Sequence, residues 1–235
     1  VSLSLTAPSA TAIGLQHLEL EARDASGTLL GRGTHEFCIV PPLADAPGLE
    51  AADEGASALL TALGLTSTSG GTLIATQLTT PLREQLIAGR KVLLVANSMQ
   101  ALSDPERNVP VGDGANFPKM QIREREGTPW DGRWMGAFSW RRTDGPWAAL
   151  PNGPMLDEHW GGLIPKFVLT GFRSTAFGGL VDAGIAVAWL HKAAALTKRS
   201  FLGKGWMTVS TFDFTSEEAQ ANPLAPHVLK ALAES

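Results

Sequence analysis

The chain has 235 residues, of which 44% are hydrophobic and 18% are charged, and its formal net charge is -4. This length and apolar content are sufficient for a buried core, which excludes a fibrous or an intrinsically disordered protein. Basic residues cluster only as Arg141-Arg142 and Lys198-Arg199, so nucleic acid is not an expected partner. The longest apolar stretch is too short to span a bilayer, and we expect no membrane segment.

The N-terminal residues 1–42 are predicted to be the terminal strands of an immunoglobulin-like β-sandwich. Apolar and charged residues alternate through residues 18–23, and Ser26-Gly27 is typical of a hairpin turn before a second strand at residues 28–40. Pro41 and Pro42 end the region because proline donates no backbone hydrogen bond, and we place a domain boundary after residue 42. The stretch has room for roughly three of the about seven strands of such a sandwich. We therefore expect an upstream part of the polypeptide, a separate chain or a symmetry-related copy to complete it.

Residues 43–235 are predicted to form an α/β domain around a strand at residues 90–96. That run is almost entirely apolar, as expected for a strand of a parallel sheet that helices cover on both faces. A second apolar run lies at residues 72–76, and between the two runs Thr80, Pro81 and Gly89 are typical of the start and end of a helix. These segments predict a βαβ unit. A helix with one apolar face is expected just before it, at residues 53–63.

Further strands are predicted at residues 167–172, 180–189 and 206–214, and a closing helix at Asn222-Pro223 onward. The predicted fold class is therefore α/β, with a mainly parallel sheet flanked by helices. Between these elements, the regular pattern is lost at residues 97–160, which we interpret as an insertion. Long irregular segments of this kind are usually functional or packed against a neighbour.

The insertion carries the candidate binding residues. It contains five of the seven tryptophans: Trp130, Trp134, Trp140, Trp147 and Trp160. Indoles stack on the apolar faces of sugar rings, and they also fill gaps between domains. We favour packing, and keep substrate binding as the alternative role of Trp130, Trp134, Trp140 and Trp147. Asp157 and Glu158 are further substrate-binding candidates, but adjacent carboxylates diverge and do not straddle a glycosidic bond, so helix capping is the expected role of Asp157.

The sequence predicts neither a catalytic residue nor a cofactor. Ser98 follows the strand at residues 90–96, where a nucleophile elbow would place its serine, with His159, His191 or His227 as the base. Such an elbow needs small neighbours, so we interpret Ser98 as structural. The histidines show no i, i+4 pair and Cys38 is the single cysteine, so neither a metal nor a disulfide is expected.

Several short motifs occur in an order that resembles a known family. They are Gly-Arg-Gly-Thr-His-Glu-Phe at 31–37, Phe-Ser-Trp at 138–140, Gly-Pro-Trp at 145–147, Leu-Pro-Asn-Gly-Pro-Met-Leu-Asp at 150–157, Asp-Ala-Gly at 182–184, and Gly-Lys-Gly at 203–205 through Thr211-Phe212. This order resembles the C-terminal part of family 2 glycoside hydrolases, the β-galactosidase-like enzymes. The resemblance implies a flavodoxin-like module similar to a class I glutamine amidotransferase that has lost its chemistry. It also implies that the sugar-cleaving carboxylates lie in an upstream TIM barrel.

Two functions are consistent with these features. The first is an accessory, non-catalytic segment of a glycoside hydrolase, which helps to fold, orient or oligomerise a catalytic barrel outside these residues. Amidotransferases use a cysteine thiolate, whereas Cys38 precedes the α/β module, so the chain alone is expected to be inactive. The alternative is an autonomous sugar-binding or hydrolytic α/β protein, with carbohydrate as its partner and the tryptophan-rich region as its pocket.

Overall fold

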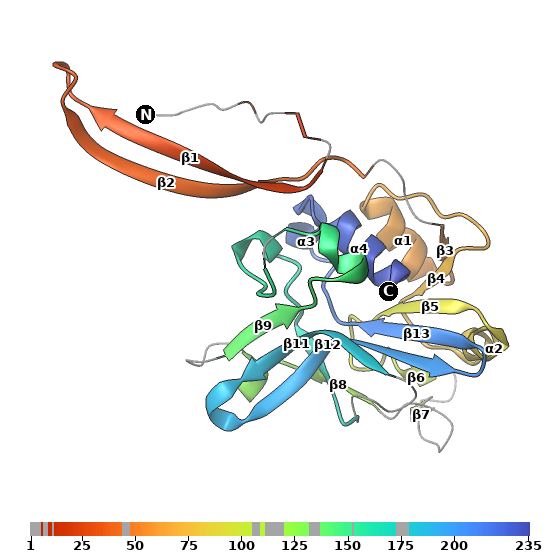
Figure 1. The fold of residues 1–235 in the computed structure, drawn as a ribbon. Helices are drawn as coiled ribbons and strands as arrows, with labels where there is room; N and C mark the ends of the chain where they lie inside the picture. The colour runs from red at the N-terminus through yellow and green to blue at the C-terminus, as the bar shows by residue number, and fades with distance from the viewer. Residues whose placement is uncertain are drawn as a thin grey trace.

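The computed structural model describes residues 6, 9–10, 12–43, 48–104, 109–110, 120–131, 137–151, 153–172 and 179–235. Within these ranges the strands form one nine-stranded sheet and two two-stranded sheets (Figure 1). The large sheet contains β3 (Leu49–Ala51), β4 (Thr72–Ala75), β5 (Lys91–Val95), β8 (Gln121–Glu124), β9 (Ala137–Arg141), β10 (Phe167–Thr170), β11 (Leu180–Val187), β12 (Lys192–Leu202) and β13 (Gly205–Ser210).

The remaining elements of the described residues are two small sheets, four α-helices and several short 3-10 turns. The small sheets pair β1 (Gly14–Arg23) with β2 (Leu29–Ile39), and β6 (Ser103–Asp104) with β7 (Val109–Pro110). The helices are α1 (Glu54–Ala62), α2 (Thr80–Ala88), α3 (Glu217–Ala221) and α4 (Ala225–Glu234), and the 3-10 turns are η1 (Pro129–Asp131), η2 (Gly145–Ala149), η3 (Glu158–Trp160) and η5 (Ala188–Leu190). Among the described residues, no helix has both the length and the apolar character needed to cross a membrane.

The predicted N-terminal hairpin is confirmed. Strands β1 and β2 pair antiparallel, and they extend away from the body that contains the large sheet (Figure 1). The turn between them is held by Asp24, whose carboxylate accepts hydrogen bonds from the backbone N–H groups of Ser26 and Thr28, each at 2.9 Å. Gly27 takes a φ of 86°, a conformation that a residue with a side chain rarely adopts. The predicted boundary after residue 42 stays a prediction.

The predicted βαβ unit is also confirmed. Strand β4 pairs with β5 in parallel, and α2 connects them. The helix is capped by Thr79, one residue before the expected cap, and the Thr79 side chain accepts a hydrogen bond from the backbone N–H of Leu82. The helix ends at Gly89, with a φ of 120°. In β5, residues 92–95 are all buried, as expected for a strand that is covered on both faces.

The helix expected at residues 53–63 is α1, and its cap also ties it to the sheet. The Asp53 carboxylate accepts a hydrogen bond from the backbone N–H of Ala56 at the helix start. The same carboxylate accepts a second one, at 2.7 Å, from the N–H of Thr76 just after β4. A single side chain therefore satisfies a free donor of the helix and fixes the helix against the end of a strand.

The predicted mainly parallel sheet of the flavodoxin or amidotransferase kind is wrong, because the large sheet is mixed and mainly antiparallel. Only β3–β4, β4–β5 and β5–β13 pair in parallel, whereas the five pairings beyond β13 are antiparallel. The reason lies in the connections. Gly203 and Lys204 alone join β12 to β13, and residues 188–191 join β11 to β12. Connections this short link antiparallel strands, since a parallel pair needs a crossover of about a dozen residues.

Two apolar cores lie on opposite faces of the sheet. Helices α1 and α4 pack on the face that carries Leu93 and Val95, together with the buried Trp147 and Trp160. Helix α2 packs on the other face, against Val92 and Leu94. Successive residues of β5 thus point into different cores, which is the alternation of a strand. The antiparallel half of the sheet, β8 to β12, carries the candidate residue Trp140 on its edge strand β9.

Candidate functional site

The structure separates the predicted tryptophans into two groups. Trp147 is 1% exposed and lies with its ring centroid 6.2 Å from that of Phe212, and the ring centroid of Trp160 lies 5.9 Å from Phe212 on the same face. Packing is therefore confirmed for Trp147. Trp130 and Trp140 are half-buried, and both line one open cleft of about 640 Å³. Trp134 lies outside the described residues.

The buried tryptophans are organised by the guanidinium of Arg141, at the end of β9. Its Nη atoms donate hydrogen bonds to the carbonyl oxygens of Trp147, Leu150 and Pro151, at 2.8 to 3.0 Å. The guanidinium also lies 5.2 Å from the ring centroid of Trp160, a cation–π contact. Burial lowers the pKa of Arg141, although an arginine guanidinium stays charged in proteins. This part of the insertion is a packed structural unit.

The two candidate carboxylates do not form an acid/base pair. Asp157 caps η3, with its carboxylate accepting a hydrogen bond from the backbone N–H of His159 at 3.1 Å, so the predicted capping role is confirmed. Glu158 lies in the first turn of η3, and its side chain is exposed. Neither lines the tryptophan cleft. Their position therefore gives no support to a role in substrate binding.

The three histidines considered as partners of Ser98 have other surroundings. The ring of His159 lies 3.7 Å from the Glu36 carboxylate, and His227 Nε2 lies 2.9 Å from the carbonyl oxygen of Pro41. His191 lies at the tryptophan cleft. The thiol of Cys38 is half-buried, and burial, together with the nearby Asp157, raises its pKa, which disfavours a thiolate nucleophile. In the described part of the chain, no group of three or more His, Cys, Asp or Glu side chains has a metal-binding arrangement.

The tryptophan cleft lies where β10 and β12 meet η1 and β9. Its walls are the indoles of Trp130 and Trp140, and its remaining lining residues are Leu169, Thr170, Gly171, Phe172, Val181, His191, Lys192, Ala193, Ala194 and Ala195. Among the described residues, His191 is the only one other than glycine with a positive φ, 50°. Its conformation turns the chain from η5 into β12 and places His191 and Lys192, both exposed, at the cleft. Sequence reasoning considered His191 only as a base for Ser98 and missed Lys192, since no local pattern connects either residue with the tryptophans.

Both tryptophans of the cleft are held in place by neighbouring groups. The Arg125 guanidinium donates hydrogen bonds of 2.7 Å to the carbonyl oxygens of Trp130 and Pro165, which fixes the η1 turn. Trp140 lies directly opposite Gly184 in the pairing of β9 with β11. A Cβ on Gly184 would lie 3.0 Å from Trp140 Cζ2, so the indole lies against bare backbone. The backbone of Trp130 and the indole of Trp140 are therefore each held by neighbouring groups.

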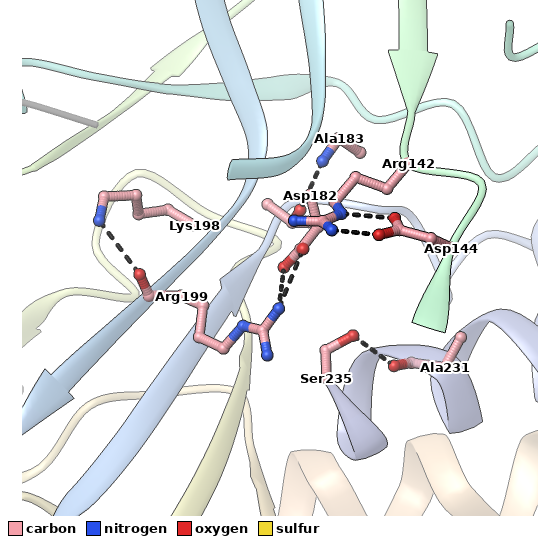
Figure 2. A network of polar contacts seen from close by, with 9 residues as sticks. Arg142, Asp144, Asp182, Ala183, Lys198, Arg199, Ala231 and Ser235 are labelled. Carbon is pink, nitrogen blue, oxygen red and sulfur yellow. Dashed lines mark hydrogen bonds and ion pairs between the residues drawn. The ribbon is translucent and has the colours of Figure 1, made fainter. Parts of the chain in front are cut away.

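A second polar feature lies inside the sheet, around Asp182 (Figure 2). Asp182 is 1% exposed, and Arg199 Nη2 lies 3.1 and 3.3 Å from its two carboxylate oxygens. Strand β11 is irregular here, because Val181 pairs with Lys198 while Ala183 pairs with Thr197. Asp182 is thus the extra residue of a β-bulge, a device that redirects a side chain. In the sequence, Asp182 is the single charged residue of the apolar run 180–187. This isolated charge is the signal from which a buried ion pair could have been predicted.

The ion pair has further charged neighbours. Arg142 donates its backbone N–H to the carbonyl oxygen of Asp182, at 2.7 Å, and its side chain pairs with Asp144 (Figure 2). Burial raises the pKa of the Asp182 carboxyl, and Arg199 opposes this shift. The Arg199 guanidinium also lies 5.2 Å from the centroid of the Trp206 ring. Because these partners belong to neighbouring strands of the sheet, we interpret the network as a structural tie between β11, β12 and β13.

The β1–β2 hairpin has one apolar and one charged face. Residues opposite each other in an antiparallel pair point to the same side, and Leu18, Leu20 and Ala22 face His35, Gly33 and Gly31. We call this side, which also carries Phe37 and Ile39, the apolar hairpin face. The other side carries Leu15 and Cys38 at one end, and otherwise His17, Glu19, Glu21, Arg32, Thr34 and Glu36. The described residues leave Leu20 46% exposed, and neither strand pairs with a further described strand.

No protein-family model matches this chain, and no curated protein matches its sequence.

Proposed function

We propose that this chain is an accessory, non-catalytic segment of a β-galactosidase-like glycoside hydrolase. In this proposal the β1–β2 hairpin completes a β-sandwich contributed by another part of the polypeptide or by a separate chain. The rest of the segment then orients or assembles a catalytic barrel that lies outside these residues. The order of the motifs between residues 31 and 212 supports the assignment to this class of enzyme.

The observation that carries the proposal is the apolar hairpin face. A two-stranded hairpin is marginally stable in water unless further strands or a helix cover its apolar side. Leu20 remains 46% exposed in the described structure, and both outer edges of the hairpin leave backbone donors and acceptors without a paired strand. Exposed edges of this kind associate with other strands. A sandwich partner would bury the apolar side and satisfy the edges at the same time.

The roles of the reactive side chains support a non-catalytic segment. Asp157 caps η3, Asp182 pairs with Arg199, and the thiol of Cys38 has a raised pKa. Asp157 and Asp182 therefore maintain structure, and the Cys38 thiol is poorly suited to act as a nucleophile. Catalytic carboxylates of glycosidases instead face each other across a substrate.

The test introduces a charge on each face of the hairpin in the complete natural polypeptide. Leu20→Lys places a lysine on the apolar hairpin face, and Thr34→Lys is the matched control on the opposite face. We expect Leu20→Lys to lower the Tm and the hydrolysis of an aryl β-galactoside, while Thr34→Lys leaves both close to wild type. Purified residues 1–235 should show no hydrolysis. Equal effects of the two variants, or turnover by residues 1–235 that Ser98→Ala or Glu158→Ala removes, would overturn the proposal.

A further inference from the structure

The tryptophan cleft has the features of a small-molecule site. Its volume of about 640 Å³ falls within the range of about 300–1,000 Å³ that is usual for ligand pockets. Aromatic and small apolar residues form most of its lining, with Thr170, His191 and Lys192 as polar exceptions. This combination of apolar walls and few polar groups is the usual composition of a binding site.

The backbone position of Trp130 and the indole of Trp140 are fixed in advance of any ligand. Trp130 belongs to a 3-10 turn that Arg125 fixes by a hydrogen bond to its carbonyl oxygen, and Trp140 rests on the backbone at Gly184. A side chain that is already ordered loses little conformational entropy when a ligand binds. Aromatic residues in such positions act as rigid contact surfaces with a polar N–H group at one edge.

Small residues form one part of the cleft lining, which we call the floor. Ala193, Ala194 and Ala195 of β12 line it together with Gly171, and none of these side chains extends beyond a methyl group. The backbone conformation of His191, with a φ of 50°, is one that side-chain-bearing residues seldom adopt. Strained residues of this kind cluster at binding sites, and here the strain sets His191 and Lys192 beside the floor.

We propose that this cleft binds a pyranose ring of a carbohydrate. A pyranose has an apolar face that stacks on an indole. Its hydroxyl groups accept hydrogen bonds from the Lys192 ammonium, and they donate hydrogen bonds to the His191 ring or accept them from it. A quaternary ammonium ligand, the other common partner of paired aromatic side chains, is disfavoured by the positive charge of Lys192. This inference goes beyond the accessory role and rests on the cleft alone, so it is independent of the hairpin and of the parent enzyme.

The experiment follows the indole N–H signals of ¹⁵N-labelled residues 1–235 by nuclear magnetic resonance. The probes are methyl β-D-galactopyranoside, methyl β-D-glucopyranoside and lactose, with choline as the quaternary ammonium comparison. We expect saturable shifts of the Trp130 and Trp140 signals with at least one sugar, and no shift of the Trp206 signal. Each signal is assigned by its disappearance in the corresponding tryptophan-to-phenylalanine variant.

Two variants test the site by different routes. Trp140→Ala removes one wall and should raise the Kd for the sugar about tenfold, a loss of about 1.4 kcal/mol. Ala193→Leu fills the cleft while both indoles remain, and since Ala193 is exposed it should fold normally and weaken binding to a similar degree. Trp206→Phe is the control and should leave the Kd unchanged. The inference is overturned if none of the sugars shifts the two signals, if neither cleft variant weakens binding, or if choline binds more tightly than the sugars.

Discussion

Trp140 and Gly184 lie directly opposite each other on β9 and β11, and the indole occupies the space that a side chain at Gly184 would take. A Cβ at that position would lie 3.0 Å from Trp140 Cζ2 and 2.8 Å from the carbonyl oxygen of Ala194. Both contacts are shorter than ordinary van der Waals separations, and the second involves backbone that cannot rotate away. The glycine is therefore a packing requirement of this strand pair, and it fixes one wall of the tryptophan cleft.

Gly184→Ala should destabilise the chain by about 1–3 kcal/mol, because overpacking in a sheet forces a shift of the backbone or the indole. Urea unfolding measures the change in the free energy of unfolding. Gly33→Ala is the matched control, since a Cβ there meets nothing within 4 Å, although Gly33 also lies in a strand. Equal free energies of unfolding for the two variants would contradict this account of Trp140.

Trp147→Ala should destabilise the chain by about 3–5 kcal/mol, the usual cost of truncating a large aromatic side chain in a core. The indole is 1% exposed, and its neighbours Phe212 and Leu150 belong to the same apolar core. Met99→Ala removes a side chain that is 51% exposed and should change the free energy of unfolding little. A Trp147→Ala variant as stable as Met99→Ala would show that this part of the insertion does not pack as described.

Asp182 and Arg199 should show strong energetic coupling. Asp182→Asn leaves the Arg199 guanidinium beside a buried site without its counter-charge, and we expect a loss of about 3 kcal/mol. Replacing both, as Asp182→Asn with Arg199→Met, should cost clearly less than the sum of the two single changes. A double-mutant cycle by urea unfolding measures this difference. Additive effects would mean that the pair contributes nothing beyond its separate side chains.

Local signals were enough to predict the N-terminal half of the fold. The hairpin at Ser26 and Gly27, the capped helix after Asp53 and the βαβ unit up to β5 all depend on residues close together in the sequence. Helix α2 is capped by Thr79 and not by the expected Thr80. The sequence does not separate the two, because both carry the same side-chain hydroxyl group. Local sequence patterns therefore predict a helix or strand correctly when the residues that start it, end it and form its buried face all lie within it or next to it.

Strand β12 was missed because much of it is polar, although its partners β11 and β13 are its neighbours in the sequence. Lys198, Arg199 and Ser200 resemble an exposed loop, yet Lys198 is buried, with its Nζ donating to the carbonyl oxygen of Arg199 and the hydroxyl of Ser200. The strand's apolar surroundings come from β10, β11 and β13. Without β12, the sheet was expected to continue in parallel.

The candidate site was predicted only in part, because its two sides are distant from each other in the sequence. Trp130 and Trp140 were selected by residue type, and the structure brings both to one cleft. The opposite side, from Thr170 to His191 and Lys192, comes from β10 and the start of β12, and no local pattern connects these residues with the tryptophans. Trp147, selected by the same criterion, is a core residue instead.

The stability contributed by Asp213 should depend on pH. Burial raises the pKa of its carboxyl, but hydrogen bonds from Thr215 and Ser216 lower it by more, so the pKa lies below its ordinary value of 3.8. Stabilisation by a group with a lowered pKa is complete above the unfolded-state value and is lost as the pH falls through the folded-state value. Asp213→Ala should therefore cost about 2 kcal/mol at pH 7 and progressively less below pH 3.8.

The control for this prediction is Asp213→Asn, which keeps an acceptor oxygen but does not titrate. The difference in stability between Asp213→Asn and Asp213→Ala should be constant between pH 7 and the acid range. Urea unfolding of the three proteins across this range measures both differences. A gap between wild type and Asp213→Ala that stays the same below pH 3.8 would contradict the ionised role of Asp213.

Hydrogen exchange across the β1–β2 hairpin tests the central claim most directly, namely that the apolar hairpin face is completed by another part of a glycoside hydrolase. The measurement uses purified residues 1–235 at a concentration where the mass in solution is that of a monomer, with β5 as the internal reference. We predict that amides of residues 14–39 exchange far faster than those of residues 91–95, because the hairpin alone buries few of its groups. A monomer in which both stretches are equally protected would show that the hairpin is self-sufficient and would contradict the account.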